Sequence, residues 1–361
     1  MTILTLDAGG TNFVFSALCD GKEIATPVCM PSEAADLGRC LANLRNGFRS
    51  VIEQTGVQPD AISFAFPGPA DYEHGIIGDL PNFPSFRGGV ALGAYLEQEF
   101  GVPVFINNDG NLFAYGEAMA GMLPEVNRRL AEAGSKHRYR NIIGITLGTG
   151  FGCGVVVNGS LLTGDNGAGG DVWCLRNSKY PDKIAEESVS IRAVKRVYAE
   201  LSGSTAELTP YDIFLIAEGQ KEGDTEAARQ SFAEMGTQAG DSIATALTLI
   251  DGLVVIGGGL TGAAKYIMPS LMDALNAQLG TFGGDRFPRL QMKAYNLDED
   301  SQFAAFAEDT SQRIAIPFSE TTVDYNPVKC TGVAVSRLGA SRAIALGAYH
   351  FAVNHLNKNT N

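Results

Sequence analysis

Hydrophobic positions follow two different periods along this chain, and the alternation between them predicts an α/β protein. Short apolar runs of strand length end at residues 7, 66, 106, 147 and 256, and each is followed by residues that form turns. Between these runs, apolar residues recur at helical spacing over residues 37–55, 184–199 and 225–249. Strands and helices that alternate in this way favour mixed sheets covered by helices.

One local arrangement occurs twice along the chain. Residues 2–18 predict a strand, a glycine loop and a second strand before an Asp-Gly turn, and residues 142–157 repeat this order before an Asn-Gly turn. The repeat predicts two related domains that face each other. A length of 361 residues allows two domains, because a single core rarely grows beyond about 300 residues. Residues 285–327, where aromatic and acidic residues interleave, are expected to form a surface insertion.

Composition and charge narrow the class of protein. No run of about 18 apolar residues could span a bilayer, and the N-terminus lacks the pattern of a signal peptide. We therefore expect a cytoplasmic protein with no membrane partner. The net charge of −13 would repel a phosphate backbone, which argues against nucleic acids as partners. The six cysteines include no Cys-x-x-Cys pair, so neither a structural zinc site nor a disulfide framework is expected.

Two glycine loops are candidates for binding phosphate groups. The Asp-Ala-Gly-Gly-Thr-Asn segment at 7–12 joins two predicted strands, and its glycines allow backbone amides to approach a phosphate because they carry no Cβ. Asp7 would reach a bound Mg²⁺ through water, since Mg²⁺ uses few carboxylates. The alternative is a hairpin that is merely capped by an acid. The Gly-Thr-Gly-Phe-Gly segment at 148–152 forms a second loop of the same kind, so a nucleotide would be held between the two halves.

A third glycine segment, Gly-Gly-Gly-Leu-Thr-Gly at 257–262, follows a predicted strand and opens a helix, which would let a nucleotide lie close to the backbone. It also fits the dinucleotide pattern Gly-x-Gly-x-x-Gly, although this strand lies late in the chain and no acid clearly follows where the ribose requires one. The sequence contains no P-loop motif. The predicted nucleotide-binding residues are Asp7, Gly9, Gly10, Thr11, Asn12, Gly148, Thr149, Gly150, Gly257, Gly258 and Gly259.

Asp109 is the candidate catalytic base. It follows a predicted buried strand, in the segment Asn-Asn-Asp-Gly-Asn at 107–111, and precedes a helix that is expected to start near Leu112. The positive end of the helix dipole would keep its carboxylate ionised, so that it could accept a proton from an alcohol. In phosphoryl transfer such a base mainly orients the nucleophile. The alternative is that Asn108 and Asp109 only cap the helix.

Taken in order, these motifs resemble the ROK family of bacterial sugar kinases and related repressors. The set comprises Asp-x-Gly-Gly-Thr at the start, Asn-Asp-x-Asn near 109, Gly-Thr-Gly-x-Gly near 150, Asn-Gly-Ala-x-Gly after it and Gly-Gly-Gly near 258. The resemblance covers roughly residues 1–270 and the final helix. It implies an α/β actin-like ATPase/hexokinase (ribonuclease H-like) fold with two α/β domains around a cleft. The predicted domains are residues 1–110 with 338–361, and residues 111–337.

The resemblance also implies roles for individual residues. The catalytic aspartate of the family falls on Asp109, and its partner for the sugar hydroxyls falls on Asn108. The acidic sugar ligand falls on Asp171, which is shorter than the usual glutamate, and the histidine three positions later falls on Cys174. The glutamate of a later Glu-x-x-x-Ser pattern falls on Glu186, and a competing alignment places it on Glu187. The predicted sugar-binding residues are Asn82, Asn108, Asp109, Asp171, Glu186 and Glu187.

Two departures from the family pattern bear on metal binding and on the substrate. The usual zinc motif, Cys-x-Cys-Gly-x-x-Gly-Cys, is absent between Cys174 and Glu186, so no structural zinc is expected. The changes at Asp171 and Cys174 would alter recognition around the anomeric end and C2 of the sugar, where glucose, mannose, fructose and the N-acetylated hexosamines differ.

The resulting hypothesis is a sugar kinase that uses ATP with Mg²⁺ to phosphorylate a hexose or N-acetylhexosamine at its 6-hydroxyl. A homodimer is implied by the resemblance alone. A sugar-binding protein with weak or no kinase activity is one alternative, motivated by Asp171 and Cys174. A sugar-responsive regulator is a further one, but Asp7 leaves no room for a preceding helix-turn-helix.

Overall fold

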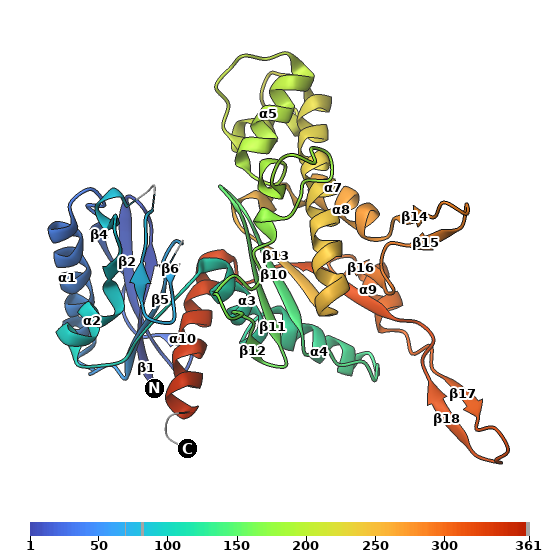
Figure 1. The fold of residues 1–361 in the computed structure, drawn as a ribbon, viewed down its shortest axis with the longest axis horizontal. Coiled ribbons are helices and arrows are strands. Elements are labelled where there is room, and N and C mark those ends of the chain that lie inside the picture. The colour runs from blue at the N-terminus through green and yellow to red at the C-terminus, as the bar shows by residue number, and fades with distance from the viewer. Residues whose placement is uncertain (69, 81–82, 359–361) are drawn as a thin grey trace.

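The structure, a computed structural model, describes residues 1–68, 70–80 and 83–358. Its core consists of two six-stranded sheets, and two helices lie between them in Figure 1. No helix in the described part of the chain is both long enough and apolar enough to cross a membrane.

The first sheet contains the N-terminal strands in the order β3-β2-β1-β5-β9, with β4 paired to β2. The strands are β1 (Thr2–Ala8), β2 (Asn12–Cys19), β3 (Lys22–Glu23), β4 (Val28–Pro31), β5 (Ala61–Ala65) and β9 (Val104–Asn107). β1 and β2 form an antiparallel hairpin, whereas β5 and β9 run parallel to β1. The predicted N-terminal meander is therefore confirmed.

The second sheet repeats this plan, in the order β12-β11-β10-β13-β19-β16. Its strands are β10 (Ile142–Leu147), β11 (Phe151–Val157), β12 (Ser160–Leu161), β13 (Leu253–Gly257), β16 (Lys293–Asn296) and β19 (Cys330–Val335). An antiparallel hairpin, β10–β11, again precedes strands that run parallel to its first member. The duplicated unit seen in the sequence is thus present as duplicated topology.

Helices cover both faces of the first sheet because its side chains alternate between them. Leu4 and Leu6 of β1 belong to the apolar core with Phe48 of α1 (Leu37–Thr55), whereas Ile3 packs with Tyr349 of α10 (Ala340–Lys358). Helix α1 has the predicted bounds: the Asp36 side chain accepts a hydrogen bond from the Arg39 N–H at its start, and Gly56 ends it with a φ of 63°.

A small three-stranded sheet closes one end of this lobe. It consists of β6 (Ala70–Asp71), β7 (Ile76–Ile77) and β8 (Val90–Ala91), with the short helix η1 (Pro84–Phe86) and helix α2 (Leu92–Phe100) beside it in the chain. Phe66, Phe83 and Phe86 are fully buried and pack their rings together there, with centroids 4.9 to 5.6 Å apart.

Helices α3 (Asp109–Met119) and α10 lie between the two sheets and pack tightly on each other. Their backbones touch at two glycines: a Cβ on Gly116 would overlap the Ala343 carbonyl, and one on Gly347 would overlap the Leu112 carbonyl. Both sheets are therefore linked through a helix crossing that tolerates no side chain at these two positions.

The other face of the second sheet is covered by the long helix α7 (Thr225–Ile250) and by α8 (Ala264–Leu275), which share its core. The remaining elements of this lobe are α4 (Met122–Glu132), η2 (Val172–Cys174), η3 (Ala185–Glu187), α5 (Ile191–Ser202), α6 (Pro210–Ala217) and η4 (Gly259–Ala263). The helix predicted over 184–199 was placed too early: α5 starts at Ile191, because Ser190 is extended (φ −163°) and the Ile191 N–H donates to the Gly148 carbonyl.

The segment 285–327 is only in part a surface insertion. β16 forms an edge of the second sheet beside β19, and Phe303 and Phe306 of α9 (Asp300–Ala307) are buried. Two hairpins extend from this region: β14 (Gln278–Gly280) with β15 (Arg286–Pro288), and β17 (Gln312–Ala315) with β18 (Thr322–Tyr325). The strand β16 and the helix α9 contribute to the core, but they were not predicted because aromatic and acidic residues interleave in this segment.

Candidate active site

The candidate residues lie where parallel strands end. In the first sheet Asp7 is level with Ala65, and Ala65 is level with Asn107, so β1, β5 and β9 end at one edge. In the second sheet Thr146 is level with Gly257, which places the loops after β10 and β13 side by side. Ligands of open α/β sheets commonly bind outside the carboxyl ends of the strands.

Helix α3 begins at Asp109 and not near Leu112 as predicted, because Asn108 caps it. The Gly110 N–H donates to Asn108 Oδ1 and to Asp109 Oδ1, each at 2.8 Å. Asn107 Oδ1 accepts hydrogen bonds from the Asn108 N–H (2.8 Å) and from Asn111 Nδ2 (3.0 Å). Within the described residues, Oδ2 of Asp109 accepts no hydrogen bond. Capping of the helix by Asn108 therefore leaves Oδ2 of Asp109 available to another group.

The surroundings of Asp109 make it a better base than a free aspartate. Partial desolvation by the surrounding protein raises the pKa of its carboxyl, although the side chain stays accessible to solvent. Hydrogen bonds from backbone amides oppose this shift, while the negative charge of Asp7 adds to it. Asp7, at the end of β1, and Asp109, just after β9, lie at the same edge of the first sheet.

Tyr72, in the loop after β6, joins this group although sequence reasoning missed it. Its hydroxyl donates to the Phe66 carbonyl (2.9 Å), and burial raises its pKa. Interaction with the Asn108 side chain partly opposes that shift, whereas the charges of Asp109 and Asp171 add to it. We call Tyr72, Asn108, Asp109 and Asp171 the acceptor group. The only signal for Tyr72 in the sequence is its place shortly after a strand whose end lies beside that of β9.

Asp171 is the member of the acceptor group that comes from the second lobe. Gly170 lies against the β11 backbone, where a Cβ would come within 3.3 Å of the Cys153 carbonyl, and Gly110 approaches the same carbonyl from α3. Burial raises the pKa of the Cys153 thiol to about 12, and the charge of Asp171 contributes to the increase. Cys174 is exposed, and its thiol donates to the Asp171 carbonyl (3.0 Å).

The first glycine loop is tied down on its outer side. The Gly9 N–H donates to the Asn12 carbonyl (3.0 Å), while Ser32 donates through Oγ to the Gly10 carbonyl (2.6 Å) and through its N–H to the Thr11 carbonyl (2.9 Å). Gly10, Thr11 and Asn12 are exposed. The loop is thus a fixed, solvent-facing turn next to Asp7, as a phosphate site requires.

The second glycine loop is held in place by the charged pair Glu186 and Arg192. Only Glu186 was predicted from the sequence. Glu186 accepts a hydrogen bond from the Phe151 N–H (3.1 Å), and its carboxylate fills the space where a Cβ on Gly150 would lie. Arg192 donates to both Glu186 (3.0 Å) and Glu187 (3.1 Å). The Glu186 side chain is 22% exposed and that of Glu187 45%, so Glu186 is the one that faces the loop. Arg192 also contacts the Thr149 carbonyl (3.4 Å).

The glycines of the third segment differ in the space beside them: some are packed against other residues, and some are not. A Cβ on Gly257 would come within 2.5 Å of the Phe113 ring, and Gly258 (φ 95°) lies against Leu147 of β10. Gly259 has no atom within 4 Å of such a Cβ. Packing explains the first two glycines, whereas Gly259, like Gly262, has open space where a Cβ would lie.

The structure therefore brings Asp7 together with Asn108, Asp109 and Asp171, and separately places Gly148–Gly150 beside Gly257–Gly259. It also places Glu186 against the second glycine loop, with no described contact to the acceptor group. The prediction for Asn82 lies outside the described residues. The roles of all these predicted site residues in binding sugar or nucleotide stay predictions.

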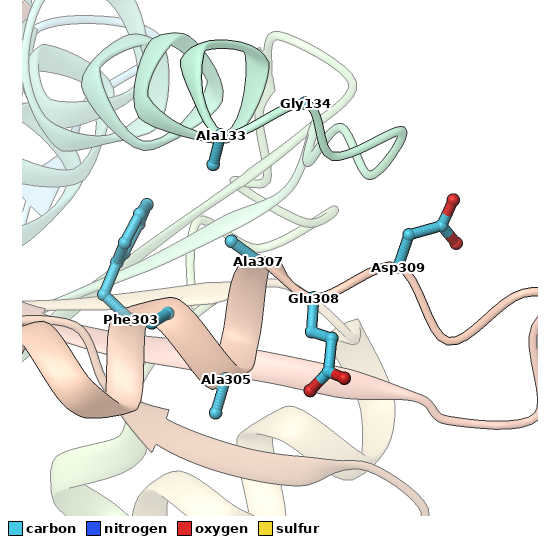
Figure 2. A pocket seen from close by; sticks show the side chains of 8 residues that line it. Ala133, Gly134, Phe303, Ala305, Ala307, Glu308 and Asp309 are labelled. Atoms are coloured by element: carbon cyan, nitrogen blue, oxygen red, sulfur yellow. The ribbon is translucent and has the colours of Figure 1, made fainter.

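A hollow of about 630 Å³ lies elsewhere, beside α9, and we call it the α4–α9 hollow (Figure 2). Phe303 of α9 and Ala133 after α4 point toward each other across it, and Glu308 and Asp309 are also among its lining residues. It contains none of the predicted site residues. In the part of the chain that the structure describes, no cluster of three or more His, Cys, Asp or Glu side chains could hold a metal ion. A single carboxylate such as Asp7 fits Mg²⁺ bound mainly by phosphate oxygens and water.

Comparisons with known proteins agree with these motifs. The model of the ROK family matches residues 3–296. The solved structure of the glucokinase from Parabacteroides distasonis is 60% identical, with a TM-score of 0.90 and 98% of each chain covered. The curated N-acetyl-D-glucosamine kinase of Vibrio cholerae is 27% identical over 71% of this chain and 83% of its own length. The curated glucokinase of Thermotoga maritima is 32% identical over 48% of this chain, and the match spans only half (50%) of that enzyme.

The two repeated sheets and the family match confirm the predicted fold class, an α/β fold of the hexokinase type. The matched residues include the Asp7 loop, Asp109 and the third glycine segment. This chain belongs to the ROK family.

Proposed function

We propose that this protein is a sugar kinase that transfers the γ-phosphoryl group of ATP to the 6-hydroxyl of a hexose or N-acetylhexosamine, with Asp109 as the base. The observation that carries the proposal is the position of Asp109 at the start of α3, where its pKa is raised and where Asn108, Tyr72 and Asp171 surround it. A cytoplasmic location is part of the same proposal.

The chemistry assigned to Asp109 follows from its environment. Its carboxylate accepts the proton of the sugar hydroxyl as the oxygen bonds to the γ-phosphorus, and the bond to the bridging oxygen of ADP breaks. A carboxyl with a raised pKa retains that proton better than the carboxyl of a free aspartate does. The Gly110 N–H holds Oδ1, so Oδ2 is the oxygen left to accept the proton.

The acceptor group supplies hydrogen bonds to the sugar. Asn108 Oδ1 is engaged by the Gly110 N–H, so the Asn108 amide nitrogen is the part of this side chain that can donate to a sugar hydroxyl. Asp171 approaches from the other lobe and can accept from a further hydroxyl. Its side chain is shorter than the glutamate usual in the family, so we assign to Asp171 a role in substrate choice.

The nucleotide would lie along the glycine loops. Exposed backbone amides of Gly10 and Thr11 face one side, and Thr149 and Gly259 face the other. Asp7 would hold Mg²⁺ through water, and the ion would neutralise charge on the phosphate groups. Glu186 and Arg192 keep the second loop in shape, because they bind its Phe151 N–H and its Thr149 carbonyl.

A coupled assay with Mg-ATP over a panel of hexoses and N-acetylhexosamines tests the proposal, with Asp109→Asn as the variant. We expect kcat to fall about 10²- to 10⁴-fold, the range for loss of a general base. Asp300→Asn is the matched control, because Asp300 also occupies the first position of a helix, α9, away from the site. Full activity of Asp109→Asn would show that another group is the base.

The same protein permits a direct measurement of sugar binding. Trp173 is the only tryptophan of the chain, is exposed, and lies two residues after Asp171. We expect sugar to change its fluorescence in the wild type and also in Asp109→Asn, because that substitution removes the base but little of the binding surface. Sugar-dependent fluorescence without phosphorylation of any sugar would instead identify a sugar-binding protein.

A further inference from the structure

The second glycine loop makes most of its backbone hydrogen bonds within the chain, but two of its amides are open. The Gly148 N–H donates to the Gly150 carbonyl (3.1 Å), and the Gly148 carbonyl accepts from the Ile191 N–H (2.9 Å). Within the described residues, the N–H groups of Thr149 and Gly150 donate to no acceptor. Successive backbone amides without partners are a common site for anions. These two are therefore the donors that the loop offers to a phosphate group.

A carboxylate lies beside these open amides. Glu186 Oε2 accepts a hydrogen bond from the Phe151 N–H (3.1 Å), the next amide after that of Gly150. A Cβ on Gly150 would come within 2.7 Å of the same oxygen, so glycine at this position leaves room for the carboxylate. The loop therefore carries a fixed negative charge next to the amides that an anion would use. Because like charges at short range repel each other, this charge alone would oppose the binding of a nucleotide.

Arg192 supplies the positive charge that offsets this carboxylate. Its Nη2 lies 3.0 Å from Glu186 Oε1 and 3.1 Å from Glu187 Oε1, and its Nη1 donates to the Thr149 carbonyl (3.4 Å). No other Lys or Arg in the described part of the chain forms an ion pair with Glu186. The planar guanidinium holds two carboxylates and a carbonyl at once, which the ammonium group of a lysine does not do with the same geometry. Arg192 thus contacts both the charge and the loop.

We propose that Arg192 is a positioning residue for ATP, because it neutralises the Glu186 carboxylate and so keeps the Thr149 and Gly150 amides available to a phosphate group. This role rests on the proposed function, in which the second glycine loop is part of the nucleotide site, and it adds to the effect of Arg192 on the shape of the loop. Without the arginine, Glu186 would stay on the Phe151 N–H as an uncompensated anion, and ATP would bind against its charge.

One double substitution separates this role from a purely structural one. Glu186→Gln removes the negative charge but keeps an oxygen that can accept from the Phe151 N–H. If Arg192 only holds the loop in shape, Glu186→Gln supplies no replacement for it, so adding this substitution to Arg192→Ala cannot restore the binding of ATP. If Arg192 neutralises the carboxylate, Glu186→Gln removes the charge for which the arginine was needed, and binding returns.

Steady-state kinetics of the full chain, with Mg-ATP varied at a saturating concentration of sugar, provide the measurement. We expect Arg192→Ala to raise the KM for ATP about tenfold, as one uncompensated charge near the protein surface would. The KM for the sugar and kcat should change little, because Arg192 has no described contact with the acceptor group. Arg192→Lys keeps the charge without the fork geometry and should give an intermediate KM for ATP.

The double variant, Arg192→Ala with Glu186→Gln, should return the KM for ATP to near the wild-type value. The carboxylate that then lacks its partner, Glu187, is 45% exposed, so solvent and salt screen its charge. Isothermal titration calorimetry with Mg-ATP should give the same order of affinities among the variants without any phosphorylation of sugar.

Arg128→Ala is the matched control. Like Arg192, Arg128 is shared by two carboxylates, Glu125 (2.8 Å) and Glu132 (2.5 Å), and the two arginine side chains are similarly exposed, at 55% and 52%. Arg128 lies on α4 and contacts none of the glycine loops. We expect its loss to leave the KM for ATP and the KM for the sugar unchanged.

Two results would overturn the role of Arg192. One is an unchanged affinity for ATP in Arg192→Ala, and the other is a double variant that binds ATP as weakly as Arg192→Ala does, which would leave only the effect on loop shape. A wild type that binds no Mg-ATP would overturn it as well. Binding of Mg-ATP with the expected order among the variants, but with no sugar phosphorylated, would support the role of Arg192 and contradict the proposed kinase activity.

Discussion

Replacing Tyr72 by phenylalanine would test whether the acceptor group depends on a residue that only the fold reveals. The substitution keeps the buried ring but removes the hydroxyl, which donates to the Phe66 carbonyl at 2.9 Å and interacts with Asn108. The net worth of one such hydrogen bond is about 0.5 to 1.5 kcal/mol, and a partner left unsatisfied costs about 1 to 3 kcal/mol. A loss of 1 to 2 kcal/mol in the transition state lowers kcat/KM about 5- to 30-fold.

We expect this loss in kcat/KM for the sugar, with the KM for ATP unchanged, because Tyr72 contacts Asn108 and none of the glycine loops. Steady-state kinetics with the best sugar of the panel, varied at saturating ATP and the reverse, separates the two. Tyr95→Phe is the matched control: its hydroxyl also faces a carbonyl, that of Leu41 at 3.5 Å, away from the site. Equal effects of the two substitutions on the sugar kinetics would refute a positioning role for Tyr72.

Two further predictions concern the helix that carries Asp109. Burial raises the pKa of Glu117, while its hydrogen bonds with Ser336 and the Met122 N–H oppose the shift, so the folded protein binds this proton more tightly than the unfolded chain does. The contribution of Glu117 to stability is present below the ordinary glutamate pKa and is lost as pH rises through its raised value. Glu117→Gln should therefore gain stability relative to the wild type as pH rises, measured by urea denaturation at acidic and neutral pH, and a constant difference would contradict this. Gly110→Ala would place a Cβ 2.8 Å from the Cys153 carbonyl, so we expect a loss of about 1 to 3 kcal/mol in thermal unfolding and a larger loss of kcat, whereas Gly38→Ala in α1 should be neutral in both measurements.

Local patterns predicted most of the elements, because strand and helix periods depend on neighbouring residues. Helix α1 has the predicted bounds, and the repeated hairpin appears in both sheets. The start of α3 was misplaced for a physical reason: Asn108 supplies the cap, so the helix includes Asp109 and Gly110, which a propensity argument assigns to a loop. The start of α5 was predicted seven residues too early, because the short helix η3 precedes it and the extended Ser190 separates the two.

Contacts between distant segments could not be predicted from the sequence. Tyr72 reaches the acceptor group because its loop is pinned where Gly75 (φ 64°) touches Gly93 of α2, and the Gly93 N–H donates to the Gly75 carbonyl. No local sequence pattern predicts this contact between the two glycines. Likewise β16 belongs to a sheet whose neighbouring strand, β19, lies more than thirty residues further along the chain. Asp7 and Asp109 could be grouped in advance only because parallel strands end at a common edge.

The glycine crossing of α3 and α10 has a mechanical consequence for the position of Asp109. Gly116 and Gly347 bring the two helix backbones into contact between the sheet that α10 covers and the sheet that α3 covers, so we expect any rotation of the two sheets to pivot at this crossing. Asp109 lies only about 10 Å from Gly116 along α3, at 1.5 Å per residue. Any rotation of one sheet relative to the other about this crossing would move Asp109 little and would sweep the outer parts of each lobe through much larger arcs. Such a rotation would therefore disturb the position of Asp109, the proposed base, less than that of the outer parts of each lobe.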